Sequence, residues 1–151
     1  MIGIGIIGAG DFGAAHARAI REVGGIRLAA ASRGNADALQ QFTAEHGGRG
    51  YADWRRLLDD KEVDAVLIAS PHHLHAEMAI GAAKAGKHIL LEKPMAPTVA
   101  ACDAINAAVA KGGVKLMVAH LMHFAPPCMA ARQILEEGEL GRPLAGSSWI
   151  I

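Results

Sequence analysis

The sequence predicts an α/β fold, a doubly wound and mostly parallel sheet of the Rossmann type. Short apolar runs alternate with longer segments of helical spacing along the chain. A glycine-rich turn follows the first apolar run directly and leads into the first helical segment. Glycines also stand after most of the later helical segments, where helices commonly end. Strands and helices that alternate in this way are typical of a parallel sheet with helices on both faces.

Each predicted element is bounded by turn or capping residues. The predicted strands cover residues 2–7, 26–31, 63–69, 88–91, 115–119 and 144–151, and a short extended piece lies at Tyr51. The predicted helices cover residues 14–23, 35–46, 53–58, 74–85, 98–111 and 126–137. Asp53 and Thr98 begin their helices as N-caps, and Pro126 and Pro127 open the last helix.

The final predicted strand, residues 144–151, has no expected partner. It is apolar, contains Trp149 and follows the turn at residues 140–143. An unpaired apolar edge is an aggregation hazard, so this strand is expected to belong to a second, α+β domain that the chain does not contain. We therefore expect a first domain over residues 1–122. Residues 123–151 are expected to hold a connecting helix and the first strand of a truncated second domain.

Composition and charge narrow the class of protein. The chain is 52% hydrophobic and 20% charged, with 15 basic and 15 acidic residues and a formal net charge of zero. The sequence has no stripe of basic residues, so no nucleic-acid partner is predicted. No apolar run is long enough to span a membrane. The start of the chain lacks the charged segment of a signal peptide. Cys102 and Cys128 have no C-x-x-C spacing, which favours reduced thiols and a cytoplasmic location.

The glycine-rich turn, Gly8–Gly13, has the G-x-G-x-x-G pattern between a predicted strand and a predicted helix. In this context the pattern indicates dinucleotide binding, with the pyrophosphate at the amino terminus of the helix. The overlapping pattern Gly3–Gly8 has no strand before it, and we interpret it as the strand itself. The residues predicted to meet the cofactor in this turn are Gly8, Gly10, Asp11, Phe12 and Gly13.

The end of the second predicted strand bears on the choice between NADP and NAD. NAD enzymes of this fold commonly carry an acidic residue there, which binds the ribose hydroxyls. This chain has Ser32 and Arg33 instead. A hydroxyl and a guanidinium can both bind a 2′-phosphate, so we favour NADP, with NAD as the alternative. The competing interpretation is that Arg33 is only a solvent-facing loop residue.

Glu92, Lys93 and Pro94 follow the predicted buried strand 88–91 directly. In an open α/β sheet, ligands bind in the crevice at the carboxyl ends of the strands. A lysine there can donate a proton or a hydrogen bond to an oxygen of a bound substrate. The competing interpretation is a solvated Glu–Lys salt bridge at the end of a strand.

Taken together, these motifs resemble the amino-terminal, NAD(P)-binding Rossmann domain of the Gfo/Idh/MocA (glucose–fructose oxidoreductase / inositol dehydrogenase) family. Besides Gly8–Gly13, the run from Ser70 to His75 is similar to the family's strand-end motif. The run from Ala85 to Pro94 matches the family's most specific signature. The resemblance covers essentially the whole chain.

The resemblance also implies roles for individual residues. It implies that Lys93 lies beside the nicotinamide and the substrate and moves the proton that accompanies hydride transfer. It implies that Glu92 approaches the nicotinamide ribose. The residues that it places along the cofactor cleft are Ser70, Pro71, His72 and His75.

Two departures from the family pattern are visible. His123 stands where the family commonly has an arginine, in the run from His120 to Pro126. Family members also carry an antiparallel β-sheet domain that supplies most of the substrate-binding face, and the chain ends where that domain would begin. A homo-oligomer is therefore expected only of a full-length protein.

The histidines suggest a competing site, because His72, His73 and His75 follow one strand end. Residues at i and i+1 do not share a helix face, so no metal site is predicted there. His16 and His46 are expected at the surface, and His88 is expected to be structural. His120 and His123 lie near the predicted crevice, where they can contact cofactor or substrate.

Three functions from different classes follow. The leading one is an NAD(P)-dependent oxidoreductase that transfers a hydride between the nicotinamide and a hydroxyl or carbonyl of a sugar or cyclitol. The second is a non-catalytic module that binds or senses the dinucleotide and lacks the substrate domain. The third is a metal-dependent hydrolase built on the histidines.

Overall fold

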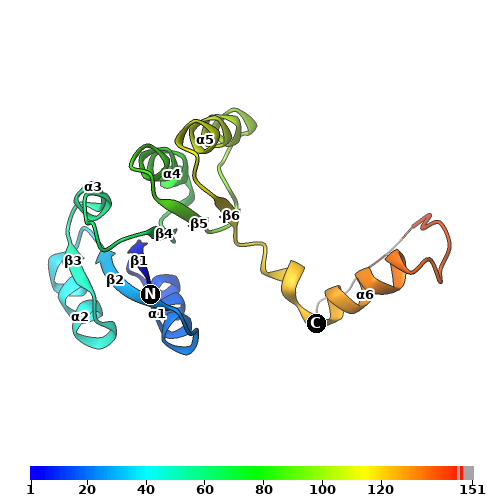
Figure 1. Ribbon diagram of the computed structural model, residues 1–151, viewed down its shortest axis with the longest axis horizontal. Coiled ribbons are helices and arrows are strands. Elements are labelled where there is room, and N and C mark those ends of the chain that lie inside the picture. Colours follow the sequence, from blue (N-terminus) through cyan, green and yellow to red (C-terminus); the bar gives the residue numbers. More distant parts are fainter. Residues whose placement is uncertain (146, 148–151) are drawn as a thin grey trace. The chain divides into compact units, whose positions relative to one another are not determined.

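The computed structural model describes residues 1–145 and 147, which form two compact units. The first unit, Met1–Ala119, contains a sheet of six strands with helices packed against it (Figure 1). The strands are β1 (Ile2–Ile7), β2 (Ile26–Ser32), β3 (Arg49–Tyr51), β4 (Ala65–Ile68), β5 (His88–Leu91) and β6 (Leu116–Val118). The second unit, His120–Ile151, is described separately below.

The sheet is parallel throughout and has the strand order β3-β2-β1-β4-β5-β6. The chain starts in the middle and moves outward in both directions, which is the doubly wound order of a Rossmann fold. The register aligns the carboxyl ends of the central strands. Ile7 pairs with Ser32 on one side and with Ile68 on the other, and Ile68 pairs with Leu91. The loops that follow these strands therefore leave from one edge of the sheet.

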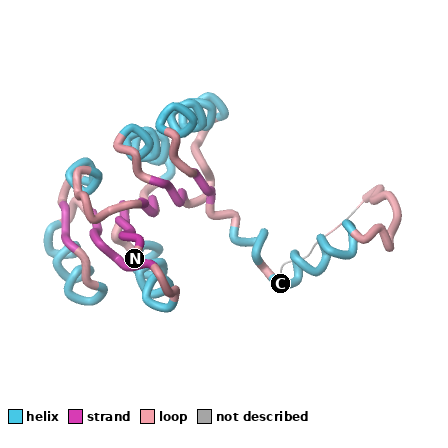
Figure 2. The backbone as a smooth tube through the Cα atoms, in the orientation of Figure 1, coloured by secondary structure: helices cyan, strands magenta, loops and turns pink. Residues whose placement is uncertain are grey.

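The helices cover both faces of the sheet (Figure 2). On one face, α1 (Asp11–Glu22) and α2 (Ala36–His46) bury Ile20 and Phe42 in a cluster with Ile6. The elements on the other face are α3 (Trp54–Leu58), the short 3₁₀ helix His72–Leu74, α4 (His75–Lys84) and α5 (Val99–Gly112).

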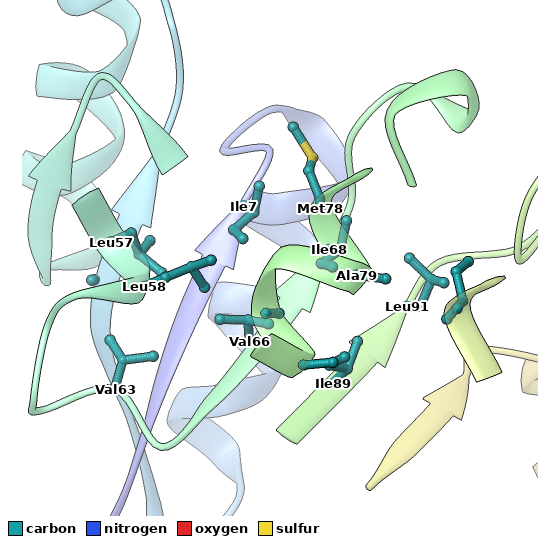
Figure 3. Close-up of a cluster of buried hydrophobic side chains, with 14 of the residues drawn as sticks. Ile7, Leu57, Leu58, Val63, Val66, Ile68, Met78, Ala79, Ile89 and Leu91 are labelled. Carbon is teal, nitrogen blue, oxygen red and sulfur yellow. The ribbon is translucent and has the colours of Figure 1, made fainter. Parts of the chain in front are cut away.

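Adjacent residues of a strand point to opposite faces, so both must be apolar in a sheet covered on both sides. Ile6 packs in the cluster under α1 and α2, whereas Ile7 packs in the cluster shown in Figure 3. Figure 3 also shows Ile68 and Leu91, which are 0% exposed. Burying a side chain of this kind contributes about 1.5–3 kcal/mol. This requirement explains the near-continuous apolar runs of the central strands.

The overlapping glycine pattern at the start of the chain is confirmed as strand β1. A Cβ atom at Gly3 would lie 1.8 Å from the carbonyl oxygen of Glu62, and one at Gly5 would lie 2.7 Å from Leu57 Cδ2. These glycines therefore allow the segment around α3 to pack against the strand, and they are not part of a ligand-binding turn.

Predicted caps are confirmed where a polar side chain starts a helix. Asp53 Oδ1 accepts a hydrogen bond from the Arg55 amide at 3.0 Å, and Thr98 Oγ1 accepts one from the Ala101 amide at 3.2 Å. Asn35 caps α2 in the same way. Several boundaries differ from the prediction by one to three residues. Helix α1 begins at Asp11 rather than at residue 14, and α4 begins at His75 after a 3₁₀ turn.

The second unit contains a 3₁₀ helix, Leu121–Phe124, and helix α6, Pro126–Glu136. Prolines at the first positions of α6 start it as predicted, because their missing N–H groups would have had no helical partner. The predicted strand 144–151 falls largely outside the described residues, and Leu144, Ala145 and Ser147 are not in a strand. Over the residues that the structure describes, no helix is long and apolar enough to cross a membrane.

Candidate functional site

Two hollows lie at the carboxyl ends of the central strands. The larger has a volume of about 660 Å³ and is lined by Gly8–Gly10, Ser32–Gly34 and residues of α3 and α4. The smaller has a volume of about 290 Å³. Its lining residues are Phe12, Ala69, Ser70, His72, Glu92 and Lys93. Because Ala69 and Ser70 line both hollows, the glycine turn and the Glu92–Lys93 segment face adjoining spaces.

The glycine turn has the local geometry that its sequence predicts. Gly8 has φ +101°, and a Cβ atom there would lie 2.5 Å from the carbonyl oxygen of Ala69. The amides of Gly8 and Ala9 both donate to the carbonyl oxygen of Ser32, at 3.0 and 3.1 Å. A Cβ atom at Gly13 would lie 2.5 Å from the carbonyl oxygen of Gly8. The turn is thus tied to the end of β2, and α1 lies close against it.

The amino terminus of α1 presents backbone donors beside this turn. Gly10 is the N-cap residue, and no side chain accepts a hydrogen bond at this cap among the described residues. A Cβ atom at Gly10 would have no neighbour within 4 Å among the described residues, so no packing contact of that part of the chain requires glycine there. Free N–H groups and the positive end of the helix dipole form an anion-binding position. This geometry fits the pyrophosphate of a dinucleotide.

Ser70 supplies a second sign that the site fits a polar ligand. Its hydroxyl oxygen is buried and has no hydrogen-bond partner among residues 1–145 and 147. Buried polar atoms in proteins are almost always paired. Since Ser70 lines both hollows, a ligand with hydroxyl or phosphate oxygens can provide the missing partner.

Two arginines line the larger hollow, and their surroundings differ. Arg33 Nη1 donates to the carbonyl oxygen of Ala9 at 3.0 Å, and no carboxylate of the described chain pairs with it. Arg55 lies over the ring of Trp54, pairs with Asp53 at 3.4 Å and also pairs with Glu77. The Arg33 cation is therefore the one available to an anionic ligand. Ser32, its neighbour, is 4% exposed and also lines this hollow.

Lys93 is exposed and lines the smaller hollow, where its side-chain nitrogen makes no hydrogen bond or ion pair with the described residues. Glu92 is held on both oxygens. Oε1 lies 2.9 Å from His16 Nε2, and Oε2 accepts the backbone amide of Lys93 at 3.1 Å. Glu92 thus pairs with a histidine of α1, and the solvated Glu–Lys salt bridge considered from the sequence is not formed.

His75 lies beneath the site, outside the lining of both hollows. It is 0% exposed, and its two ring nitrogens each lie 2.9 Å from a carbonyl oxygen, Nδ1 from that of Pro94 and Nε2 from that of Ser70. It thereby joins the loop after β4 to the loop after β5. His72 lines the smaller hollow, with its ring centroid 5.5 Å from that of His75, and Pro71 lines the larger one.

The structure corrects the predictions for two other histidines. His16, expected at the surface, is the partner of Glu92, and its side chain is only 26% exposed. The spacing of four residues places His16 on the helix face of Phe12, but the contact with Glu92 depends on how α1 packs beside the end of β5. His46 was also expected at the surface, but its side chain is 2% exposed against Phe42.

Three further histidines were considered from the sequence. His88 is structural as predicted, since its Nδ1 accepts the Lys115 amide at 3.1 Å. His120 and His123 belong to the second unit, where His123 lines a separate hollow along α6. Within the described part of the chain, no cluster of three or more histidine, cysteine or acidic residues is arranged to hold a metal ion.

Comparisons with known proteins identify the family. A family model described as "Oxidoreductase family, NAD-binding Rossmann fold" (GFO_IDH_MocA) matches residues 2–120. Inositol 2-dehydrogenase 2 of Saccharopolyspora erythraea is 38% identical over 144 residues, and levoglucosan dehydrogenase of Pseudarthrobacter phenanthrenivorans is 37% identical over 153 residues. These alignments include 93% and 95% of this chain but only 42% and 39% of the relatives.

Solved structures have the same fold. A levoglucosan dehydrogenase in complex with NADH and levoglucosan is 34% identical, with a TM-score of 0.87. The match covers 93% of this chain and 40% of that one. KijD10, a 3-ketoreductase of Actinomadura kijaniata in complex with NADP and TDP-benzene, is 29% identical, with a TM-score of 0.84, and the match covers 91% and 42% of the two chains. The chain therefore belongs to the Gfo/Idh/MocA family of oxidoreductases and contains that family's NAD-binding Rossmann fold.

Proposed function

We propose that the full-length protein exchanges a hydride between a nicotinamide dinucleotide, NADP in preference to NAD, and a hydroxyl or carbonyl group of a sugar or cyclitol. The nicotinamide, when bound, accepts or supplies the hydride. The chain spans about two fifths of the relatives that it matches, so the substrate and the reaction belong to the proposal. The named relatives act on inositol and levoglucosan, which supports this substrate class.

One observation carries the proposal. The side chain of Lys93, which has no hydrogen-bond or ion-pair partner among the described residues, lines a hollow that adjoins the glycine turn through Ala69 and Ser70. A dinucleotide anchored at the amino terminus of α1 can extend past Ser70 toward Lys93. Ser70, Pro71 and His72 would line its path, and His75 would support them from below.

Lys93 would manage the proton of the reaction. When a hydroxyl group is oxidised, its carbon loses a hydride to the nicotinamide and its oxygen loses a proton, which the neutral amine of Lys93 accepts. In the reverse direction the ammonium form returns a proton to the carbonyl oxygen as the carbon gains the hydride. General acid–base catalysis of this kind typically contributes about 10²–10⁴-fold in rate.

The test is Lys93→Ala in the full-length protein, with Lys111→Ala, an exposed lysine at the end of α5, as the matched control. We expect kcat to fall by about 10²–10⁴-fold in the Lys93 variant, with a nearly unchanged Kd for the dinucleotide. Turnover at a near-normal rate would remove Lys93 from the mechanism.

The rival proposal is a module that binds the dinucleotide without turnover. The position of the predicted cofactor contacts supports this rival, because the residues that line both hollows all belong to the first unit. Titration of the 151-residue chain with NADPH measures binding, and an assay for oxidation of inositol and levoglucosan with NADP⁺ as the hydride acceptor measures turnover; together they separate the two proposals. Binding without oxidation in the full-length protein as well would favour the rival. Homo-oligomer formation and cytoplasmic location stay predictions.

A further inference from the structure

The contact between His16 and Glu92 joins two parts of the chain that are 76 residues apart. His16 belongs to α1, the helix whose amino terminus follows the glycine turn, and Glu92 directly follows β5. Nε2 of His16 lies 2.9 Å from Oε1 of Glu92, and the two side chains are 26% and 14% exposed. This partly buried pair therefore links the proposed cofactor helix to the proposed catalytic segment.

The placement of His16 follows from helix geometry. His16 is four residues after Phe12, so the two side chains lie on one face of α1. Phe12 lines the smaller hollow together with Glu92 and Lys93. Gly13, between them, allows the helix to lie close to the turn, since a Cβ atom there would lie 2.5 Å from Gly8 O. The face of α1 that carries Phe12 and His16 is thus turned toward the end of β5.

The other hydrogen bonds of Glu92 connect this contact to Lys93. The amide of Glu92 donates to the carbonyl oxygen of Ile68 at 2.9 Å, which fixes its backbone to the end of β4. Its carboxylate accepts the Lys93 amide on Oε2 while Oε1 faces His16. A carboxylate only accepts hydrogen bonds, so Nε2 of His16 must carry a hydrogen to bond to it.

We propose that His16 is a positioning residue: it holds the Glu92 carboxylate so that Glu92 fixes the Lys93 amide, and with it the direction in which the Lys93 side chain enters the smaller hollow. The role in catalysis rests on the function proposed for Lys93, whereas the structural link does not. Small errors in placing a reacting group are costly, and a displacement of about 1 Å can reduce a rate by about 10²-fold.

The partial exposure of the His16–Glu92 pair allows its positioning role to be tested without loss of the fold. Solvent-accessible ion pairs contribute little to stability, and this pair is partly open to solvent. Variants at His16 should therefore fold. Arg18→Leu is a suitable control, because Arg18 is an exposed residue of the same helix and makes no hydrogen bond to the described residues.

The first arm of the test is NMR spectroscopy of the 151-residue chain, and it needs no substrate. We compare the amide signal of Lys93 and the ring nitrogens of His16 in the wild type and in His16→Leu, His16→Gln and Glu92→Gln. We expect His16→Leu to shift the Lys93 amide signal and to speed its hydrogen exchange. His16→Gln should restore it in part, because a glutamine amide can also donate to Glu92. Glu92→Gln should change the nitrogen shifts of the His16 ring.

The second arm measures kcat and KM in the full-length protein with NADP and with inositol or levoglucosan. We expect His16→Leu to lower kcat by about 10–100-fold, with little change in the KM for NADP, and His16→Gln to recover much of this loss. An unaltered Lys93 amide in His16→Leu overturns the inference. If the wild type lacks turnover, the proposed function fails, and the NMR arm still decides whether His16 positions Glu92 and Lys93.

Discussion

The imidazole Nδ1 of His75 lies 2.9 Å from the carbonyl oxygen of Pro94, and the His75 side chain is fully buried. The other ring nitrogen faces the carbonyl oxygen of Ser70 at the same distance. A single side chain thus connects the backbone of two loops that bear Ser70 on one side and Glu92 and Lys93 on the other. The two loops belong to neighbouring strands, β4 and β5.

Replacing His75 by leucine should destabilise the first unit strongly. Leucine fills a similar volume but has no N–H. It therefore leaves the carbonyl oxygen to which the imidazole N–H donates, that of Ser70 or of Pro94, without its donor, and a buried unsatisfied group costs about 1–3 kcal/mol. Urea unfolding followed by circular dichroism should therefore give a free energy of unfolding lower by about 1–3 kcal/mol. His73→Leu is the control, because His73 is exposed. Equal stability of the two variants would contradict a clamping role for His75.

Gly8 and Gly10 should respond differently to substitution by alanine. At Gly8 the backbone has φ +101°, and the added Cβ would lie 2.5 Å from Ala69 O, so Gly8→Ala should lower stability and disturb the turn. At Gly10 the added Cβ would meet no described residue within 4 Å, so Gly10→Ala should keep the fold. If a pyrophosphate approaches the backbone there, Gly10→Ala should still weaken the binding of NADPH.

Thermal unfolding and NADPH fluorescence titration of both glycine variants check this pair of outcomes. A Gly10→Ala protein that is as stable as the wild type and binds NADPH equally well would place the pyrophosphate elsewhere. A destabilised Gly10→Ala protein would instead show that the residue has a packing role.

The sequence was sufficient to predict the fold, because the signals for it are local. The apolar runs of β1, β4 and β5 come from burial on both faces, and caps such as Asp53 and Thr98 act within three residues of their position. The glycine turn was predictable for the same reason. The positive φ at Gly8 belongs to the backbone of the turn itself, although the atom that a Cβ would meet there, Ala69 O, lies on the neighbouring strand end.

Histidine contacts were not predictable in this way, because they are made across the fold. The pairing of His16 with Glu92 depends on how closely α1 packs beside the end of β5. His46 has an aromatic ring that packs on Phe42, and its burial follows from the position of α2 against the sheet. Imidazole is both apolar and polar, so periodicity does not distinguish a buried histidine from an exposed one.

Asp60 should make stability depend on pH through a hydrogen-bond network between the loop after α3 and strand β3. Its carboxylate accepts hydrogen bonds from Arg49 at 2.7 and 2.8 Å, from Tyr51 at 3.0 Å and from the amide of Glu62 at 2.9 Å. Burial acts to raise the pKa of Asp60, but the hydrogen bonds from Arg49, the Glu62 amide and Tyr51 together outweigh it, and the pKa is lowered.

A lowered pKa in the folded state means that Asp60 stabilises the fold at pH values above its unfolded pKa, and that this contribution is lost as the pH falls through its folded pKa. Asp60→Asn should therefore reduce the free energy of unfolding at pH 7, by about 1–3 kcal/mol. The difference from the wild type should shrink at acidic pH. Urea unfolding of both proteins at several pH values checks this, and a difference that is independent of pH would contradict it.

Arg33 should determine the preference for NADP, and Arg55 should matter less. Arg33 is exposed at the larger hollow and has no carboxylate partner among the described residues, whereas the Arg55 guanidinium pairs with Asp53 and Glu77. A hydrogen bond to a charged group contributes about 1.5–3 kcal/mol. Arg33→Ala should therefore raise the Kd for NADP by about 10–100-fold and leave the Kd for NAD nearly unchanged.

The matched variant is Arg55→Ala, which removes an arginine from the same hollow while its neighbours Asp53 and Glu77 stay. Because those two carboxylates already neutralise Arg55, we expect a smaller change in the ratio of the two Kd values than in Arg33→Ala. Calorimetric titration of each of the two variants with NADP and with NAD provides the four Kd values. If Arg33→Ala weakens the binding of both dinucleotides equally, Arg33 acts on a part that they share, such as the backbone of the turn at Ala9, and the 2′-phosphate is not its ligand.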